Sequence, residues 1–363
     1  MRLGTCIAFE FVVGIGTIAA LGYGSMRGVA ELRQLVDREA SAASLSSREL
    51  GVPGVIRPVD QPVRLEPQFA RGTQFEGVAD EILLAPLRTG RIQRIKFNRG
   101  GSSLSLRVDF DNGARAAFKP DQIHLQSVPR REVAAFRINR MLGLVSVAPA
   151  IARQFPREEI LAALDPSQRS YMARLQAEMI ADSQGNVGGE LSWWIPVIHR
   201  AKIGGFPIDG VDGIVTWKRM LSVGNDIPEK DANLARQISS MVLFDHLINN
   251  SDRWTGGNAR TSADGVMLYY MDNTLSFGVS SEGHERSIIY LKRSQKFSRS
   301  LVERMRTLTF AELKRAMARD TGPYEALLTD QEIRTVLSRR DYSLAYIDEL
   351  IQQHGTDAVL VFP

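Results

Sequence analysis

Aspartate and asparagine side chains gather in two nearby stretches of the C-terminal half. The first runs from Asn249 to Asn258 and contains Asp252; the second starts at Asp272, fourteen residues after Asn258, behind the apolar run Leu268 to Met271. Phosphoryl transfer needs one carboxylate that meets the attacking hydroxyl, and a carboxylate and an amide oxygen that hold a divalent metal across the phosphates. The pattern predicts Asp252 as the catalytic carboxylate, and Asp272 and Asn258 as ligands of Mg²⁺ or Mn²⁺.

These residue types also have a simpler interpretation. Asn, Asp and Gly are common in turns and helix caps, and either stretch alone fits that role. The position of the two stretches favours a phosphoryl-transfer site over turns and caps. A long helix predicted for residues 233–248 leads into the first stretch, and a short strand leads into the second.

A second group of candidate residues lies nearer the N-terminus, on predicted strands and a helix. Alternating apolar residues predict three strands, from Arg91 to Phe97, Leu104 to Phe110 and Ala114 to Phe118, with an Asp-Asn-Gly turn between the last two. Lys119 ends the third strand, and Glu132 lies in the first turn of a helix predicted from Arg131 to Leu142.

A strand lysine on nucleotide phosphates, with a helix glutamate beside it, recurs in kinases. We therefore predict that Lys119 and Glu132 take part in nucleotide binding. The turn between the first two strands contains Gly100 and Gly101, whose backbone could cover the phosphates.

These motifs, in their order, resemble the atypical kinases of the secretory pathway, the Golgi casein kinase and four-jointed group. The resemblance covers roughly residues 90 to 363, with gaps, and the chain looks like a bacterial-style relative of this group. The matching stretches are Ala116 to Pro120, Arg131 to Gly143, Val147 to Pro149, Asn250 to Arg253, Asp272 to Asn273 and Ser276 to Gly278.

The resemblance implies an α+β, two-lobed kinase-like fold, with a small β-rich N-lobe at residues 76–198 and a larger, mostly helical C-lobe at residues 199–363. It implies ATP and a divalent metal as cofactors. Lys119 would bind the phosphates, and Glu132 would pair with it or approach the metal. The run from Trp193 to Val197, and in it Trp194 and Val197, would join the lobes beside the adenine.

The N-terminus carries a different signal. Gly4 to Tyr23 is almost wholly apolar and close to the length of a membrane helix, so residues 1–26 are predicted as a membrane anchor and 27–75 as a linker. A cleaved signal peptide, which would make the protein secreted, and a buried helix are the alternatives. Arginines after the stretch favour a cytoplasmic body.

Composition and residue spacing argue against several other classes of protein. The net charge of +4 is scattered without a basic block, which argues against a nucleic-acid partner. Cys6 is the one cysteine, so no intramolecular disulfide forms, and the histidine spacing does not match a zinc hydrolase.

The function therefore expected is transfer of the ATP γ-phosphate to a hydroxyl. The acceptor stays open between protein Ser/Thr, a sugar or glycan, and an inositol lipid, and so does the oligomeric state. Trp254 after Asp252-Arg253, and the six-residue step to Asn258, motivate a catalytically impaired pseudokinase or nucleotide-binding module as the alternative. A membrane-tethered structural protein is the third class.

Overall fold

The computed structural model describes residues 74–98, 101–255 and 257–363. All of these residues belong to one compact unit. The predicted membrane segment (1–26) and Gly100 lie outside the described residues, as does the predicted linker except for Gln74 and Phe75. In the described part of the chain, no helix is both long enough and apolar enough to cross a membrane.

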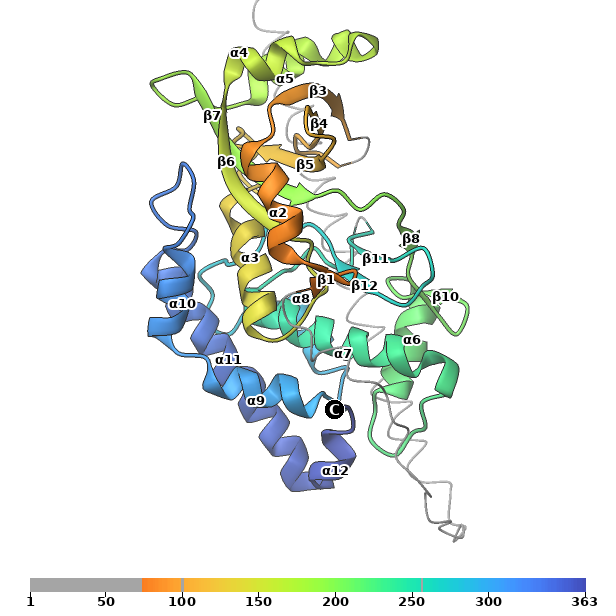
Figure 1. Cartoon of the computed structure of the whole chain (residues 1–363). Coiled ribbons are helices and arrows are strands. Elements are labelled where there is room, and N and C mark those ends of the chain that lie inside the picture. Colours follow the sequence, from red (N-terminus) through yellow and green to blue (C-terminus); the bar gives the residue numbers. More distant parts are fainter. Residues whose placement is uncertain (1–73, 99–100, 256) are drawn as a thin grey trace, which may run out of the picture. The chain divides into compact units, whose positions relative to one another are not determined.

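An antiparallel five-stranded sheet, in the order β3-β4-β5-β7-β6, forms the N-terminal half of this unit (Figure 1). The three predicted strands are confirmed, with their ends shifted by one or two residues, and Gly113 has the positive φ of 81° that the turn after β4 requires. The strands are β3 (Ile92–Phe97), β4 (Leu106–Phe110), β5 (Arg115–Pro120), β6 (Ala150–Pro156) and β7 (Asn186–Trp193).

Short helices flank this sheet, and α3 contains Glu132. The predicted helix from Arg131 to Leu142 is confirmed within one residue at either end. The elements are α2 (Asp80–Thr89), α3 (Arg130–Met141), α4 (Arg157–Ala162), the 3₁₀ helix η2 (Pro166–Tyr171) and α5 (Met172–Glu178), preceded by a hairpin of β1 (Gln74–Phe75) and β2 (Val78–Ala79).

The apolar run Leu191 to Ile198 is typical of a strand, but only its first three residues lie in one. β7 begins at Asn186 and ends at Trp193, and the next residues leave the sheet, because Pro196 has no N–H to donate to a strand. The chain then enters a different, three-stranded sheet at β8 (His199–Arg200). Residues 194–198 therefore connect the two sheets, at the place where the sequence predicted the joint between the lobes.

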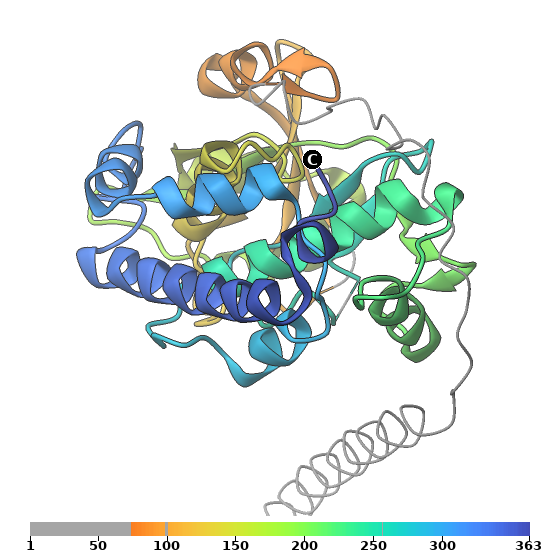
Figure 2. The same ribbon diagram turned by 90° about the horizontal axis from the view of Figure 1, so that it is seen from below.

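The C-terminal half is mainly helical and packs around α7 (Figure 2). The helices are α6 (Val211–Met220), α7 (Glu229–Ile248), α8 (Glu285–Leu291), α9 (Arg299–Thr307), α10 (Phe310–Met317), α11 (Asp330–His354) and α12 (Thr356–Val359). The strands are β8, β11 (Ala259–Thr261) and β12 (Leu268–Tyr270) in one sheet, and β9 (Lys202–Ile203) with β10 (Phe206–Pro207) in a hairpin.

Every residue of α7 from Ala235 to Ile248 is buried, so this helix forms the centre of the helical core. It starts four residues before the predicted Asn233 and ends where the sequence predicted. Asn249, at φ 57°, follows in the left-handed conformation that often terminates helices. This turn directs the chain into the loop that carries Asp252.

His246, near the end of α7, links this helix to Ser343 of α11. Its ring is fully buried; Nε2 lies 2.9 Å from the carbonyl oxygen of Glu282, and Nδ1 lies 2.7 Å from Ser343 Oγ. A carbonyl can only accept, so Nε2 donates to it and Nδ1 of the neutral ring accepts from the hydroxyl. Burial lowers the pKa of His246 to about 4.

We expect His246 to make the fold less stable in acid. The unfolded chain binds a proton near pH 6.5, whereas the folded protein resists protonation down to about pH 4. The contribution of this side chain is therefore present above pH 6.5, and about 3 kcal/mol of it is lost as the pH falls to 4. Urea unfolding of His246→Gln at pH 7 and pH 4.5 should show a smaller pH dependence than the wild type, whereas exposed His354→Gln should match the wild type. Equal pH slopes in all three proteins would contradict this assignment.

Candidate active site

Lys119 lies at the C-terminal end of β5, where its side chain is buried against the helical half of the unit. Its side-chain nitrogen Nζ is 2.5 Å from Asp272 Oδ1 and 3.5 Å from Thr274 Oγ1. Burial opposes a charge on either partner. Nevertheless the Asp272 carboxylate raises the pKa of Lys119, and the lysine lowers the pKa of Asp272. Both groups are therefore charged at neutral pH, and the two predicted residues form an ion pair.

Asp272 follows β12 and has a φ of 56°, in the left-handed region. This backbone turn sets its carboxylate beside Thr274, whose hydroxyl donates to Asp272 Oδ1 at 2.8 Å. The Asp272 side chain remains 37% exposed. A ligand can therefore reach this carboxylate although its lysine partner is buried.

Glu132 contacts the residue after Asp272 and forms no ion pair with Lys119 among the described contacts. Its Oε2 accepts a hydrogen bond of 2.5 Å from the backbone N–H of Asn273, and its Oε1 accepts one of 2.8 Å from Asn273 Nδ2. Burial raises the pKa of Glu132, and the nearby charge of Lys119 opposes that shift. The expected pairing with Lys119 is thus replaced by a direct link from α3 to the loop of Asp272.

Asp252 and Asn258 lie in one loop and are hydrogen-bonded to each other. Asn258 Nδ2 donates to Asp252 Oδ2 at 3.1 Å, and the Thr255 hydroxyl donates to Asp252 Oδ1. The backbone N–H of Asp252 donates to Asn250 Oδ1 at 3.0 Å. These bonds fix the orientation of the Asp252 carboxylate, which is only partly buried.

Arg253 joins this loop to the loop of Asp272. Its guanidinium is fully buried, pairs with Asp245 of α7, and donates to the carbonyl oxygens of Asn258 and Met271 and to Asn273 Oδ1. Burial raises the pKa of Asp245 to about 6, although Arg253 acts against this shift.

Asn250 adds a second link between the two loops. Its Nδ2 donates to the backbone carbonyl of Asp272 at 3.2 Å and to Asn273 Oδ1 at 3.3 Å. With the Arg253 bonds, this places the two polar stretches of the sequence in one hydrogen-bonded network.

Helix α3 is fixed from its other side by the C-terminal helices. Arg130 and Arg131 both bind the carboxylate of Glu332, which is 4% exposed and caps the start of α11. Arg137 donates to carbonyl oxygens at the end of α10, among them that of Ala316 at 2.5 Å. These bonds hold Glu132 against Asn273 in the structure as it stands.

The remaining predicted residues lie outside this network. Gly101 is exposed, with a φ of 84° and open space where a Cβ would point. Trp194 and Val197 lie in the connection after β7; Val197 is 50% exposed, and the Arg107 guanidinium lies 5.9 Å from the Trp194 ring centre. Trp254 is buried, and its ring stacks on that of Tyr290 in α8 with ring centres 4.1 Å apart.

The donor set fits a metal that binds together with phosphates. Among the described residues no group of three or more His, Cys, Asp or Glu side chains could hold an ion by itself. Magnesium commonly takes one or two protein carboxylates and completes its shell with water and substrate phosphates. The exposed Asp272 carboxylate, with the Asn258 amide in the linked loop, offers oxygen ligands of that kind.

Comparison with solved structures shows which known fold this arrangement shares. The Golgi casein kinase with Mn/ADP bound superposes with a TM-score of 0.58 and 16% identity, over 77% of this chain and 78% of that one. The chain has the fold of the Golgi casein kinase. The hydra Fam20 structure with sugar gives a TM-score of 0.56 and 15% identity, over 76% of this chain and 90% of that one. No protein-family model and no curated protein matches the sequence.

The kinase-like fold confirms the resemblance that the ordered motifs predicted. On this fold, sequence reasoning missed Glu190 of β7, which lies directly across from Lys119 in the β5–β7 pairing. A buried acid within the otherwise neutral run Val187 to Trp193 was the available signal. The sequence-based prediction also assigned no role to Asn250, Arg253 and Asn273, although all three lie in the motifs that carry the resemblance.

Proposed function

We propose that this chain is a phosphotransferase that moves the γ-phosphoryl group of ATP to a hydroxyl acceptor with the help of Mg²⁺ or Mn²⁺. One observation supports this most strongly: Lys119, Asp252, Asn258 and Asp272 come from three separate segments and meet in one network of ion pairs and hydrogen bonds. If these residues served only as turn formers and helix caps, the three segments would have no reason to meet.

Each residue has a defined task in the proposed reaction. The oxygen of the acceptor hydroxyl bonds to the γ-phosphorus, and the bond between that phosphorus and the bridging oxygen breaks, which releases ADP. Asp252 accepts the proton that the hydroxyl loses. Lys119 neutralises phosphate charge. Asp272 and Asn258 would hold the metal, which supplies charge neutralisation across the phosphates.

Replacing Asp252 separates turnover from binding. We expect Asp252→Asn to lower phosphoryl transfer by about 100-fold to 10,000-fold, because the amide cannot accept the hydroxyl proton, while binding of ATP with Mn²⁺ persists. Transfer of ³²P from labelled ATP into the protein itself, and into protein, lipid and glycan fractions of a lysate, measures the loss and identifies the acceptor class. Asp357→Asn, whose carboxylate is 99% exposed on α12, is the matched control.

A nucleotide-binding module without turnover is the second candidate. The close ion pair favours it, because Lys119 neutralises the carboxylate that the metal would need. Wild-type protein that binds ATP with metal, yet transfers no more phosphate than Asp252→Asn, would establish the module. Protein that binds no nucleotide under any metal condition would exclude both functions.

A further inference from the structure

Three carboxyl groups surround the single ammonium group of Lys119. They come from the loop after β12 (Asp272), from α3 (Glu132) and from β7 (Glu190), and all three act electrostatically on the lysine. Glu190 is 2% exposed and is the cross-strand partner of Lys119, so both side chains lie on one face of the sheet. The buried site thus contains more acidic groups than one lysine can neutralise.

These three carboxyl groups differ in what else they bind. Asp272 holds the lysine at 2.5 Å and faces the open side of the site, and both oxygens of Glu132 are occupied by Asn273. Glu190 has a single hydrogen bond among those described, accepted by Oε2 from the Ser192 hydroxyl at 2.7 Å. Glu190 therefore has more acceptor capacity left for the lysine than Glu132 has.

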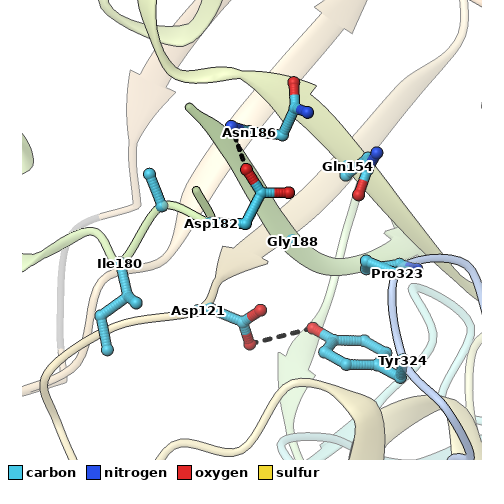
Figure 3. Close-up of a pocket in the computed structure, with 9 residues that line it drawn as sticks. Asp121, Gln154, Ile180, Asp182, Asn186, Gly188, Pro323 and Tyr324 are labelled. Atoms are coloured by element: carbon cyan, nitrogen blue, oxygen red, sulfur yellow. Dashed lines mark hydrogen bonds between the residues drawn. The ribbon is translucent and has the colours of Figure 1, made fainter. Parts of the chain in front are cut away.

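The acid nearest to Lys119 along the chain lies just past the end of β5. Asp121, two residues beyond Lys119, accepts a hydrogen bond of 3.0 Å from the Tyr324 hydroxyl. It lines a cavity of about 210 Å³ beside Gly188, which lies two residues before Glu190 on β7 (Figure 3). Glu190, and not Asp121, is thus the acid paired directly across from Lys119 on the sheet.

We propose that Glu190 is a positioning residue that binds the Lys119 ammonium when a metal–nucleotide complex draws Asp272 away from it. This inference rests on the proposed function. Lys119 is 8% exposed and its ammonium has three N–H donors, so when Asp272 is withdrawn the lysine needs an acceptor on the sheet side in addition to the phosphates. By receiving the lysine on the β7 side, Glu190 frees Asp272 for the metal and keeps Lys119 beside the phosphates.

The test is Glu190→Gln, which keeps the size of the side chain and removes its charge. ATP binding is measured by calorimetry with saturating Mn²⁺. We expect affinity to fall about tenfold, the loss typical of one hydrogen bond to a charged group. In the nucleotide-free protein the variant should melt no lower than the wild type. Glu190 has few partners to offset the cost of burying an acid, and the neutral glutamine avoids that cost. A merely structural glutamate would instead lower the melting temperature and leave binding unchanged.

Two further variants isolate the action through Lys119. Ser192→Ala removes the existing partner of Glu190 but keeps the carboxylate, so it should bind ATP with Mn²⁺ as the wild type does. In a Lys119→Met background the added Glu190→Gln change should have no further effect, because its target is gone. Wild-type affinity in Glu190→Gln would overturn the inference and leave the phosphotransferase intact, whereas a wild type that binds no nucleotide would overturn both.

Discussion

Replacement of Asp272 by asparagine is expected to abolish metal-dependent nucleotide binding while the protein stays folded. The carboxylate is the exposed oxygen donor of the site and the one that Lys119 already holds in place. An amide supplies no negative charge for a divalent cation, so affinity for ATP with Mn²⁺ should fall about 100-fold or more. Asparagine tolerates the positive φ of 56° at this position better than alanine, which avoids added backbone strain.

The matched control for this variant is Asp264→Asn in the turn between β11 and β12. Asp264 is exposed, and its hydrogen bonds among the described residues stay within its own turn, to Ser262 and Val266. Calorimetric titration of both variants with ATP, with and without Mn²⁺, measures the difference. If Asp272→Asn binds ATP as tightly as the control does, Asp272 does not hold the metal and the proposed site is wrong.

The sequence predicted the strands around Lys119 because their signals are local. Alternating apolar residues and the Asp-Asn-Gly turn depend on neighbours a few positions away, and the paired strands β3, β4 and β5 follow one another directly in the chain. The predicted residues Lys119, Asp252 and Asp272 also belong to motifs whose order is informative by itself.

Local sequence patterns could not predict which residues these side chains contact. β7 pairs with β5 only after the chain has passed through α3 and β6, so no periodicity indicated that Glu190 lies opposite Lys119. Likewise the bond from Glu132 to Asn273 joins residues 141 positions apart. The sequence placed Glu132 on the correct helix, and tertiary packing decided which partner it binds.

Arg253 is expected to be the largest single contributor to the stability of the active-site loops. Replacement by methionine leaves the Asp245 carboxylate, only 3% exposed, without its cation and removes the donors that hold the carbonyls of Asn258 and Met271. The free energy of unfolding should fall by about 3 to 5 kcal/mol, the cost of breaking a buried ion pair from one side. Urea unfolding at pH 7 measures it. Arg286→Met, an exposed arginine that bonds to Ser251 of the same loop, should cost under about 1 kcal/mol.

The double variant Asp245→Asn/Arg253→Met distinguishes charge pairing from loop positioning. Neutralising the orphaned carboxylate should restore part of the stability lost in Arg253→Met, because a buried charge without a partner costs more than a missing pair. Nucleotide binding should be lost in Arg253→Met and in the double variant alike, since methionine has no donor for the two carbonyls that join the Asp252 and Asp272 loops. Recovery of stability together with binding would mean that Arg253 acts only as the counter-ion of Asp245, and that the two loops reach their positions without it.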